Sequence, residues 1–254
     1  MHLERLISLL EIVAVVGRPV SAAEVQKIIG LPKPTCYRLM QSLHDEKLRD
    51  RPMGDGKFVI GERMIRIALL GKSDVDVHRC AALLLRRAAS SFNETVFLAR
   101  FRDSKVEIIH VETPNDPERA FIHPGLGVRP MHACSCSKAI AAFAEPAFQD
   151  KIVSGRLKQY TEHTKVMADD LRAEFAGIVQ RGFAVCNQEI DLGISSVAAP
   201  ISIGNIGAMF SVGVVGPILR FSKKNRQEIG QKLTSLSTKI SGAIQLCNVA
   251  EGHS

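Results

Sequence analysis

SAAEVQKIIGLPKPTCYRLMQSLHD, residues 21–45, is the stretch that decides the fold of the N-terminal part of the chain. It has the form of a helix, a tight turn and a second helix. Ser21 and Glu24 have the spacing of a capping box, in which each side chain accepts a hydrogen bond from the other residue's backbone N–H. Gly30 can adopt the positive φ that ends the first helix. Pro34 suits the start of the second helix, where no N–H donor is needed.

The second helix of this stretch has two distinct faces. Apolar side chains at helical spacing predict a buried face made of Cys36, Leu39, Met40 and Leu43. The opposite face is polar and partly basic and carries Pro34, Arg38, Gln41, Ser42 and Asp45. A short helix, a glycine corner and a helix with such an outward face indicate a DNA-reading helix-turn-helix. The alternative is an ordinary helical hairpin with a solvated face.

Candidate DNA contacts follow from that outward face and its flanks. The predicted set is Lys33, Pro34, Thr35, Tyr37, Arg38, Gln41 and Ser42. Arg38 can form two hydrogen bonds with guanine O6 and N7, and Gln41 can form two with adenine N6 and N7. Thr35 and Tyr37 are predicted to contact phosphates. The helix dipole disfavours the positive charge of Lys33 at the N-terminus of this helix. Either a phosphate partner or simple exposure to solvent explains why a lysine is tolerated there.

The residues that flank this motif predict a winged helix-turn-helix domain over residues 1–62. A helix is expected over about residues 3–16, because its apolar residues recur at helical spacing. After the motif, short strands at 48–51 and 57–60 enclose a turn rich in proline and glycine, which is the form of a wing. The basic residues of the wing are Arg49, Arg51 and Lys57. They would lie near phosphates, where charge gives affinity without sequence choice; the alternative is a solvated basic hairpin.

A predicted helical linker, residues 63–73, leads into a C-terminal domain over residues 74–254. Because the linker is helical, it would couple the two domains mechanically. The C-terminal part mixes strands and helices in an order that argues for an α+β fold. Strands are expected near 96–101, 106–111, 119–123, 183–189, 194–203 and 208–215, and helices near 75–89, 133–144, 146–154, 169–181 and 222–246.

Composition restricts the class of protein. The chain has 254 residues, of which 46% are hydrophobic and 23% charged, and its net charge is +7. This mild basic excess suits a polyanionic partner, and more than half of it lies in residues 1–73. No apolar run is long enough to predict a membrane span or a signal peptide. The six cysteines lack zinc-finger spacing and are expected to be reduced thiols, which predicts a cytoplasmic protein.

Three stretches carry a resemblance to a known family. Residues 30–40 contain Leu-Pro-Lys-Pro-Thr and then Arg-Leu-Met, residues 130–139 contain Pro-Met-His-Ala and then Lys-Ala, and residues 189–201 contain a glutamate, a glycine and Val-Ala-Ala-Pro-Ile. In this order, with a later Gly-Pro at 216–217, they resemble the IclR family of bacterial transcriptional regulators over nearly the whole chain. The resemblance implies an N-terminal winged helix-turn-helix, a linker helix and a C-terminal GAF-like domain that binds a small-molecule effector.

The resemblance also implies partners. The protein would bind double-stranded DNA at a palindromic operator as a homodimer or homotetramer, since two recognition helices on adjacent major-groove faces match a two-fold symmetric site. It would act as an effector-responsive, sequence-specific DNA-binding transcriptional regulator, controlling genes for catabolism of a small organic acid. No cofactor, no metal and no enzyme activity are expected. The effector, the operator and the direction of regulation stay open.

The family's effector site maps onto the C-terminal domain with several departures. The expected effector-binding residues are Met131, Cys134, Ser135, Cys136, Cys186, Glu189, Ser196, Gly213 and Val215. Ser196 stands where the family has cysteine, and Gly213 and Val215 stand where some members place serines. Backbone N–H groups at the helix start near Ser135 would attract a carboxylate. We therefore expect a carboxylate that is less polar than a small oxo acid, such as an aromatic or cyclic one.

A second hypothesis for the C-terminal domain is a thiol-based sensor or a small-molecule enzyme. It rests on a histidine and three cysteines, His132, Cys134, Cys136 and Cys186. A metal site is not favoured, because no acidic ligand or second Cys-x-x-Cys is near them in the sequence and zinc prefers three or four well-spaced ligands. Catalysis is not favoured, because the spacing reveals no partner base for a nucleophilic cysteine. No neighbouring residue in the sequence suggests a functional role for His110, His123 or His163.

Overall fold

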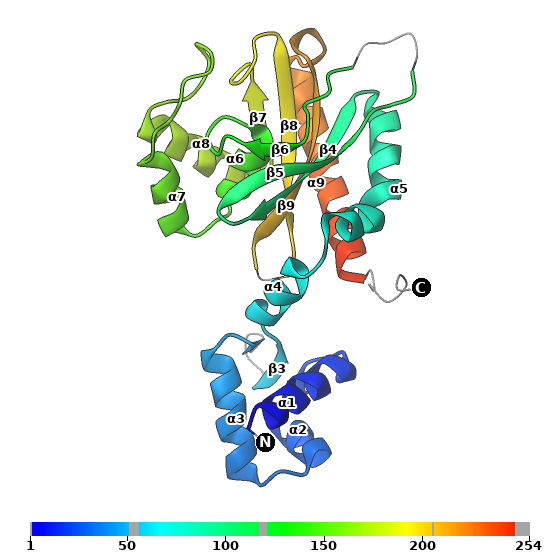
Figure 1. The fold of residues 1–254 in the computed structure, drawn as a ribbon, viewed down its shortest axis with the longest axis vertical. Coiled ribbons are helices and arrows are strands. Elements are labelled where there is room, and N and C mark those ends of the chain that lie inside the picture. The colour runs from blue at the N-terminus through cyan, green and yellow to red at the C-terminus, as the bar shows by residue number, and fades with distance from the viewer. Residues whose placement is uncertain (1, 51–55, 117–120, 205, 247–254) are drawn as a thin grey trace. The chain divides into compact units, whose positions relative to one another are not determined.

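The computed structural model describes residues 2–50, 56–116, 121–204 and 206–246 (Figure 1). The chain divides into two compact units. The first comprises Met1–Lys72 with Gly204–Ile206, and the second comprises Ser73–Ile203 with Gly207–Ser254. Each unit contains a hydrophobic core of its own, so each is described by itself.

The first unit is a winged helix-turn-helix. Its helices are α1 (His2–Val16), α2 (Ala22–Ile29), α3 (Lys33–Asp45) and α4 (Glu62–Leu70). Its strands are β1 (Val20–Ser21), β2 (Arg49–Asp50) and β3 (Lys57–Ile60), which form an antiparallel sheet in the order β1-β3-β2. The sequence predicts all of these elements except β1. A strand of two residues leaves no periodic pattern, and its pairing with β3 exists only in the folded chain.

The capping box at the start of α2 is present as predicted. Ser21 Oγ accepts a hydrogen bond from the Glu24 N–H at 3.3 Å, and Glu24 Oε2 accepts one from the Ser21 N–H at 2.8 Å. The Ser21 N–H, followed by Arg18 and the Ser21 hydroxyl, lowers the pKa of Glu24 to about 2. Gly30 ends α2 with a φ of 71°, in the left-handed region that favours glycine. The chain therefore turns within a few residues, and α3 begins at Lys33.

The core of this unit joins its helices to the wing. The buried apolar side chains include Leu9, Val13, Val20, Val25, Cys36, Leu39, Met40, Leu43 and Phe58. The predicted core positions of α3 are all among them, which confirms the predicted buried face. Burying a side chain of the leucine class contributes roughly 1.5–3 kcal/mol relative to exposure. This burial fixes the rotation of α3 and leaves its polar face in solvent.

The second unit is built on a six-stranded antiparallel sheet in the order β6-β5-β4-β9-β8-β7 (Figure 1). Its strands are β4 (Thr95–Arg102), β5 (Lys105–Glu112), β6 (Gly127–Arg129), β7 (Ala184–Asn187), β8 (Ile194–Ser202) and β9 (Ala208–Pro217). The predicted hairpin of β4 and β5 is confirmed. Pairing of β4 with β9 joins it to the strands from the end of the chain.

Helices cover both faces of this sheet. They are α5 (Asp74–Phe92), α6 (Ser135–Ala141), α7 (Pro146–Val153), α8 (Ala168–Arg181) and α9 (Lys223–Leu246), with a 3-10 turn η1 (Ile218–Arg220). α5 packs with α9, and α8 packs with both α6 and α7 (Figure 1). Phe97 and Ala99 of β4 share a core with residues of α6 and α8. The alternate residues Val96 and Leu98 are fully buried and point to the opposite face of the sheet. The predicted α+β fold is therefore confirmed.

One predicted strand is wrong. The sequence predicts a strand near 119–123, but residues 121–123 form none, and residues 117–120 lie outside the described part. The strand beside β5 is instead β6, which pairs with the first half of β5. Pro124 and Gly125 are strong turn formers, so the sequence assigns the neighbourhood of β6 to a turn. Pairing with β5 selects the strand, and no local pattern carries that information.

One cysteine also differs from expectation. Cys36, Cys134, Cys136 and Cys186 are free thiols, as expected. Cys80, on α5, is disulfide-bonded, so the expectation of six reduced thiols is wrong at this position. Disulfide formation depends on the distance between two residues in the folded chain, which sequence spacing does not give.

Candidate functional site

The outward face of α3 carries the predicted DNA contacts. Exposed residues of this face are Lys33, Pro34, Tyr37, Arg38, Gln41 and Ser42, while Thr35 is half-buried. Gln41 Nε2 donates to Asp45 Oδ1 at 2.7 Å, and Ser42 Oγ donates to the Arg38 carbonyl at 3.2 Å. Among the described residues, the exposed Arg38 guanidinium has no hydrogen-bond or ion-pair partner. Hydrogen-bonding side chains along one helix face form a surface that suits the major groove of DNA.

The described residues of the wing contribute less to this surface than the sequence predicts. Arg49 is buried, with 2% of its surface exposed; its Nε donates to the Met40 carbonyl, and its guanidinium lies 3.7 Å from the centre of the Phe58 ring. The predicted phosphate contact of Arg49 is therefore wrong, because its place on β2 turns the side chain inward. Lys57 lies half-buried on β3, where it pairs with Ser21. Arg51 lies outside the described residues.

A cavity of about 140 Å³ lies against the sheet of the second unit. Every strand of that sheet contributes to its wall, which is largely apolar. The apolar lining includes Phe97, Ile108, Ile122, Ile190, Ile194 and Val215. The polar and thiol lining comprises His123, Arg129, Cys134, Cys186, Asp191 and Ser196. The fold thus brings together four residues of the predicted effector set, namely Cys134, Cys186, Ser196 and Val215.

Arg129 brings a positive charge to this cavity. Its Nη2 donates to the carbonyls of Pro124 and Gly125, the latter at 2.6 Å. Its Nε is buried and has no hydrogen-bond partner within the described ranges. A buried donor left without an acceptor costs roughly 1–3 kcal/mol. An acceptor oxygen that reached this nitrogen would therefore be favoured.

The thiols of the cavity wall are not activated. Cys134 Sγ lies 3.2 Å from Cys136 Sγ. That hydrogen bond and burial raise the pKa of Cys134, and burial raises the pKa of Cys186 to about 12. His132 Nε2 is hydrogen-bonded to the Lys158 carbonyl at 2.9 Å, and within the described ranges His132 makes no hydrogen bond to either thiol. Protonated thiols are weak nucleophiles, so they act here as small, soft groups of the wall.

Several residues of the predicted effector set do not line the cavity. Cys136 is fully buried in the core, and Met131 packs against that core. Ser135 is also fully buried and is hydrogen-bonded to Ser196 Oγ at 2.7 Å, so it positions a wall residue. A Cβ on Gly213 would come within 2.2 Å of the Phe97 ring. The predicted effector contacts of these residues therefore stay predictions. Gly213 leaves room for the Phe97 ring of the cavity wall, because β9 pairs it with Phe97 of β4.

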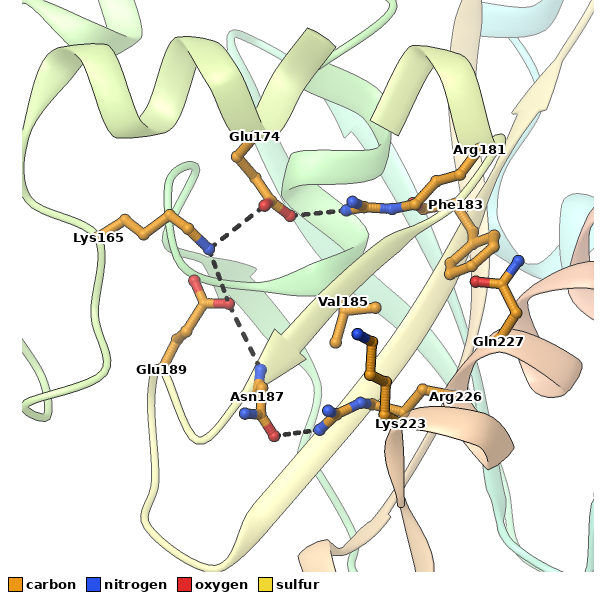
Figure 2. Close-up of a pocket in the computed structure, with 10 residues that line it drawn as sticks. All are labelled: Lys165, Glu174, Arg181, Phe183, Val185, Asn187, Glu189, Lys223, Arg226 and Gln227. Atoms are coloured by element: carbon orange, nitrogen blue, oxygen red, sulfur yellow. Dashed lines mark hydrogen bonds and ion pairs between the residues drawn. The ribbon is translucent and has the colours of Figure 1, made fainter. Parts of the chain in front are cut away.

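Glu189 lies in a separate, charged cleft of about 240 Å³ (Figure 2). Its two oxygens accept hydrogen bonds from Lys138 Nζ at 2.7 and 2.8 Å, and both side chains are buried. Burial would raise the pKa of neighbouring Glu174, but Lys138, Lys165 and Arg181 outweigh it and lower that pKa. Glu189 therefore lies apart from the apolar cavity, and its predicted effector contact stays a prediction. Its carboxylate neutralises a buried lysine and ties α6 to the segment that follows β7.

Comparisons with known proteins agree with this architecture. Residues 72–242 match the family model described as bacterial transcriptional regulator IclR C-terminal, and residues 2–48 match the IclR helix-turn-helix domain. The chain belongs to the IclR family. A similar relative is the glycerol operon regulatory protein of Streptomyces griseus, 27% identical over 221 residues, or 86% of this chain and 85% of the relative. The transcriptional repressor IclR of Escherichia coli is 25% identical over 244 residues, or 94% and 88%.

A solved structure extends the comparison to the fold of this IclR family member. It is that of an IclR homolog from Microbacterium hydrocarbonoxydans complexed with 4-hydroxybenzoate, with a TM-score of 0.59 and 20% identity. The match covers 96% of this chain and 100% of that chain, and at this identity it shows the fold alone. The family and its curated members are DNA-binding transcriptional regulators and not enzymes. In the described ranges, no helix is long and apolar enough to cross a membrane.

Several wall residues of the cavity are not predicted from the sequence. Arg129 directly precedes the Pro-Met-His-Ala stretch that carries part of the IclR resemblance, and this adjacency was an available signal. His123 receives no role from the sequence, yet it lines the cavity. His123, Ile190 and Asp191 lie outside regular helices and strands, where no hydrophobic period marks an inward side chain. Their part in the cavity follows only from the fold.

Proposed function

We propose that this IclR family regulator responds to a small carboxylate effector that binds in the cavity of the second unit. The observation that carries the proposal is Arg129, which lines this largely apolar cavity and whose buried Nε lacks a partner among the described residues. A carboxylate is the strongest common partner of a guanidinium group. Ser196 offers a hydroxyl in the lining of the same cavity. The effector would neutralise Arg129 and bury its own apolar part.

The size and polarity of the cavity narrow the class of effector. A cavity of about 150 Å³ lined by apolar groups accommodates one benzene-sized molecule, and this one measures about 140 Å³. Phe97 and several aliphatic side chains offer contacts to a ring. We therefore propose an aromatic or cyclic carboxylate. The complex of the Microbacterium relative with 4-hydroxybenzoate supports the same chemical class.

We further propose that residues 1–62 bind the operator, that 63–73 act as the linker and that 74–254 bind the effector. The proposed DNA contacts, without the buried Arg49, are Lys33, Pro34, Thr35, Tyr37, Arg38, Gln41, Ser42 and Lys57, with Arg51 kept from the sequence. A homodimer or homotetramer would place two copies of α3 on a palindromic site. The regulated genes would serve catabolism of the effector acid in the cytoplasm. The regulatory role of the family supports this assignment.

The DNA part of the proposal is tested by fluorescence anisotropy on DNA from upstream of the protein's own coding region. An unrelated duplex is the control, and salt is varied. Specific binding predicts a preference for the first duplex that survives rising salt. Arg38→Ala should cost about 1–3 kcal/mol of that preference, while Arg5→Ala, at an exposed position of α1, should cost little. Equal, steeply salt-sensitive binding to both duplexes would speak against sequence recognition there.

The effector part is tested by a thermal-shift screen of small acids. Aromatic and cyclic carboxylates should raise the melting temperature of the wild type, because a ligand that binds the native state stabilises it. Arg129→Gln should abolish the shift, while Arg156→Gln, at an exposed arginine, should retain it. A screen in which only small hydrophilic acids shift melting would overturn the proposed class. Unchanged shifts in Arg129→Gln would overturn the proposed site.

A further inference from the structure

Two imidazoles and a carboxylate meet on the face of the sheet opposite the cavity. His78 belongs to α5, and His110 and Glu112 belong to β5. His110 pairs with Leu98, and Glu112 pairs with Val96. Paired residues on adjacent strands point to the same face, so these side chains share the α5 side of the sheet with Val96 and Leu98. The group is therefore separate from the proposed effector site.

The three side chains are close enough to share one ion. The His78 and His110 rings are stacked, with their centres 3.7 Å apart. His110 Nε2 lies 3.0 Å from Glu112 Oε2. One ligand atom from each of the three residues lies within 4.8 Å of the other two, and all three residues are half-buried. Ligands of a tetrahedral zinc ion at about 2.0–2.1 Å lie roughly 3.4 Å apart, so the two imidazoles would rotate out of their stacked arrangement to converge on one ion.

We propose that His78, His110 and Glu112 bind one divalent transition-metal ion, with Zn²⁺ as the reference case. Imidazole and carboxylate donors suit Zn²⁺, and three protein ligands leave a fourth position for water. Arg86 adds a repulsive positive charge nearby. Glu112 is therefore the ligand that supplies the compensating negative charge.

A metal ion at this place would join α5 to the edge region of the sheet. In its absence, packing and one hydrogen bond within β5 hold the group together. Binding to the native state alone stabilises a protein by mass action. The ion would therefore strengthen the attachment of the first helix of the second unit to its sheet. This role differs from that of the effector, whose proposed cavity lies on the other face.

The test uses the full-length protein after treatment with a chelator. Zn²⁺ binding is measured by competition with a chromophoric chelator, and Co²⁺ serves as a spectroscopic probe. We expect one tight equivalent per chain, a Co²⁺ spectrum without a thiolate charge-transfer band, and a higher melting temperature with Zn²⁺. His110→Ala should weaken binding by more than about 100-fold, since even groups that only support ligands are worth about 10- to 100-fold. Glu112→Gln should weaken Zn²⁺ binding by at least about tenfold. Because this variant keeps the shape of the side chain, it serves as the test if His110→Ala folds poorly.

The matched control is His163→Ala. His163 lies beside Glu162, with a distance of 3.8 Å between Nε2 and Oε1, but the pair is exposed. Metal binding in this variant should equal that of the wild type. A thiolate charge-transfer band would place the ion at the cysteines instead and would overturn the proposal. Unchanged Zn²⁺ affinity in both His110→Ala and Glu112→Gln, or no binding by the wild type, would overturn it as well.

Discussion

Two arginines of the first unit have the same charge and opposite environments. Arg49 is buried against Phe58 and donates to the Met40 carbonyl, whereas Arg38 is exposed on α3. Arg49→Ala should lower the free energy of unfolding by roughly 1–3 kcal/mol, because the Met40 carbonyl loses its donor and the Phe58 ring loses its cover. Denaturant unfolding of the full chain measures the change. Arg38→Ala is the comparison and should leave stability nearly unchanged; equal losses in both variants would contradict this division of roles.

Gly213 of β9 is a second position where one side-chain atom decides the packing. A methyl group there would meet the Phe97 ring at 2.2 Å. Gly213→Ala should cost about 1–3 kcal/mol of unfolding free energy, as overpacked cores do, and should narrow the cavity by displacing Phe97. Gly242→Ala is the control, because nothing lies within 4 Å of its added carbon in α9. Alanine should stabilise that helix by about 0.5–1 kcal/mol. Both changes are read from chemical denaturation, and a neutral Gly213→Ala would contradict the close contact.

The cavity thiols should react slowly in the folded protein. The pKa of Cys186 is about 12, raised by burial, and that of Cys134 is also raised. At neutral pH almost no thiolate is present, and the thiolate fraction of Cys186 rises about tenfold per pH unit below its pKa. Alkylation followed by mass spectrometry of the labelled peptides should therefore be far slower for Cys186 in native protein than in denaturant. Equal rates in the two states would revive the hypothesis of a thiol-based sensor.

At the scale of elements, the capping box of α2 holds the start of the helix-turn-helix. Ser21→Ala removes the acceptor of the Glu24 N–H and should cost about 1 kcal/mol of unfolding free energy. Ser73→Ala is a parallel test at α5, whose capping box has the same geometry with Asp76. Ser154→Ala is the control, because Ser154 follows the end of α7 and its hydroxyl donates only to the carbonyl of Asp150. Equal effects at all of these positions would show that hydroxyl loss alone, and not capping, is being measured.

The same box has a pH signature. The folded pKa of Glu24 is about 2, against an ordinary value of 4.5. Because the folded pKa is the lower one, the stabilisation is fully present above about pH 4.5 and is lost as the pH falls toward 2. Glu24→Gln should therefore lower stability at neutral pH, and its difference from the wild type should shrink as the solution is acidified. Unfolding curves at stepwise pH measure this, and a pH-independent difference would contradict it.

Elements with a strong local signal were predictable, and elements created by pairing were not. Capping residues, glycine ends and apolar periods located α2, α3 and the hairpin of β4 and β5. β1 and β6 exist because a partner strand accepts their hydrogen bonds, and no local pattern records a partner. The same reason explains Arg49, whose charge suggested a phosphate contact while its strand position buried it. In the cavity, the family resemblance predicts Cys134 and Ser196, whereas the position of Arg129 depends on the pairing of β6 with β5.

At the scale of the whole molecule, the proposed operator and effector sites belong to different compact units of one chain. If the effector changes operator affinity by some factor, linkage requires that operator DNA change effector affinity by the same factor. Typical couplings of this kind are about 5- to 150-fold. The reciprocity is independent of whether the effector releases or tightens DNA binding. It is also independent of how the two units are arranged.

The two coupling factors can be measured separately and compared. Effector affinity is measured by calorimetry with and without saturating operator duplex, and operator affinity by anisotropy with and without saturating effector. The two ratios should agree. Arg129→Gln should remove the coupling by removing effector binding, whereas Arg38→Ala should weaken operator affinity and leave the intrinsic effector affinity of the free protein unchanged. An effector that binds the wild type with the same affinity in the presence of the operator would occupy the cavity without regulating, because a ligand with equal affinity for both states shifts neither.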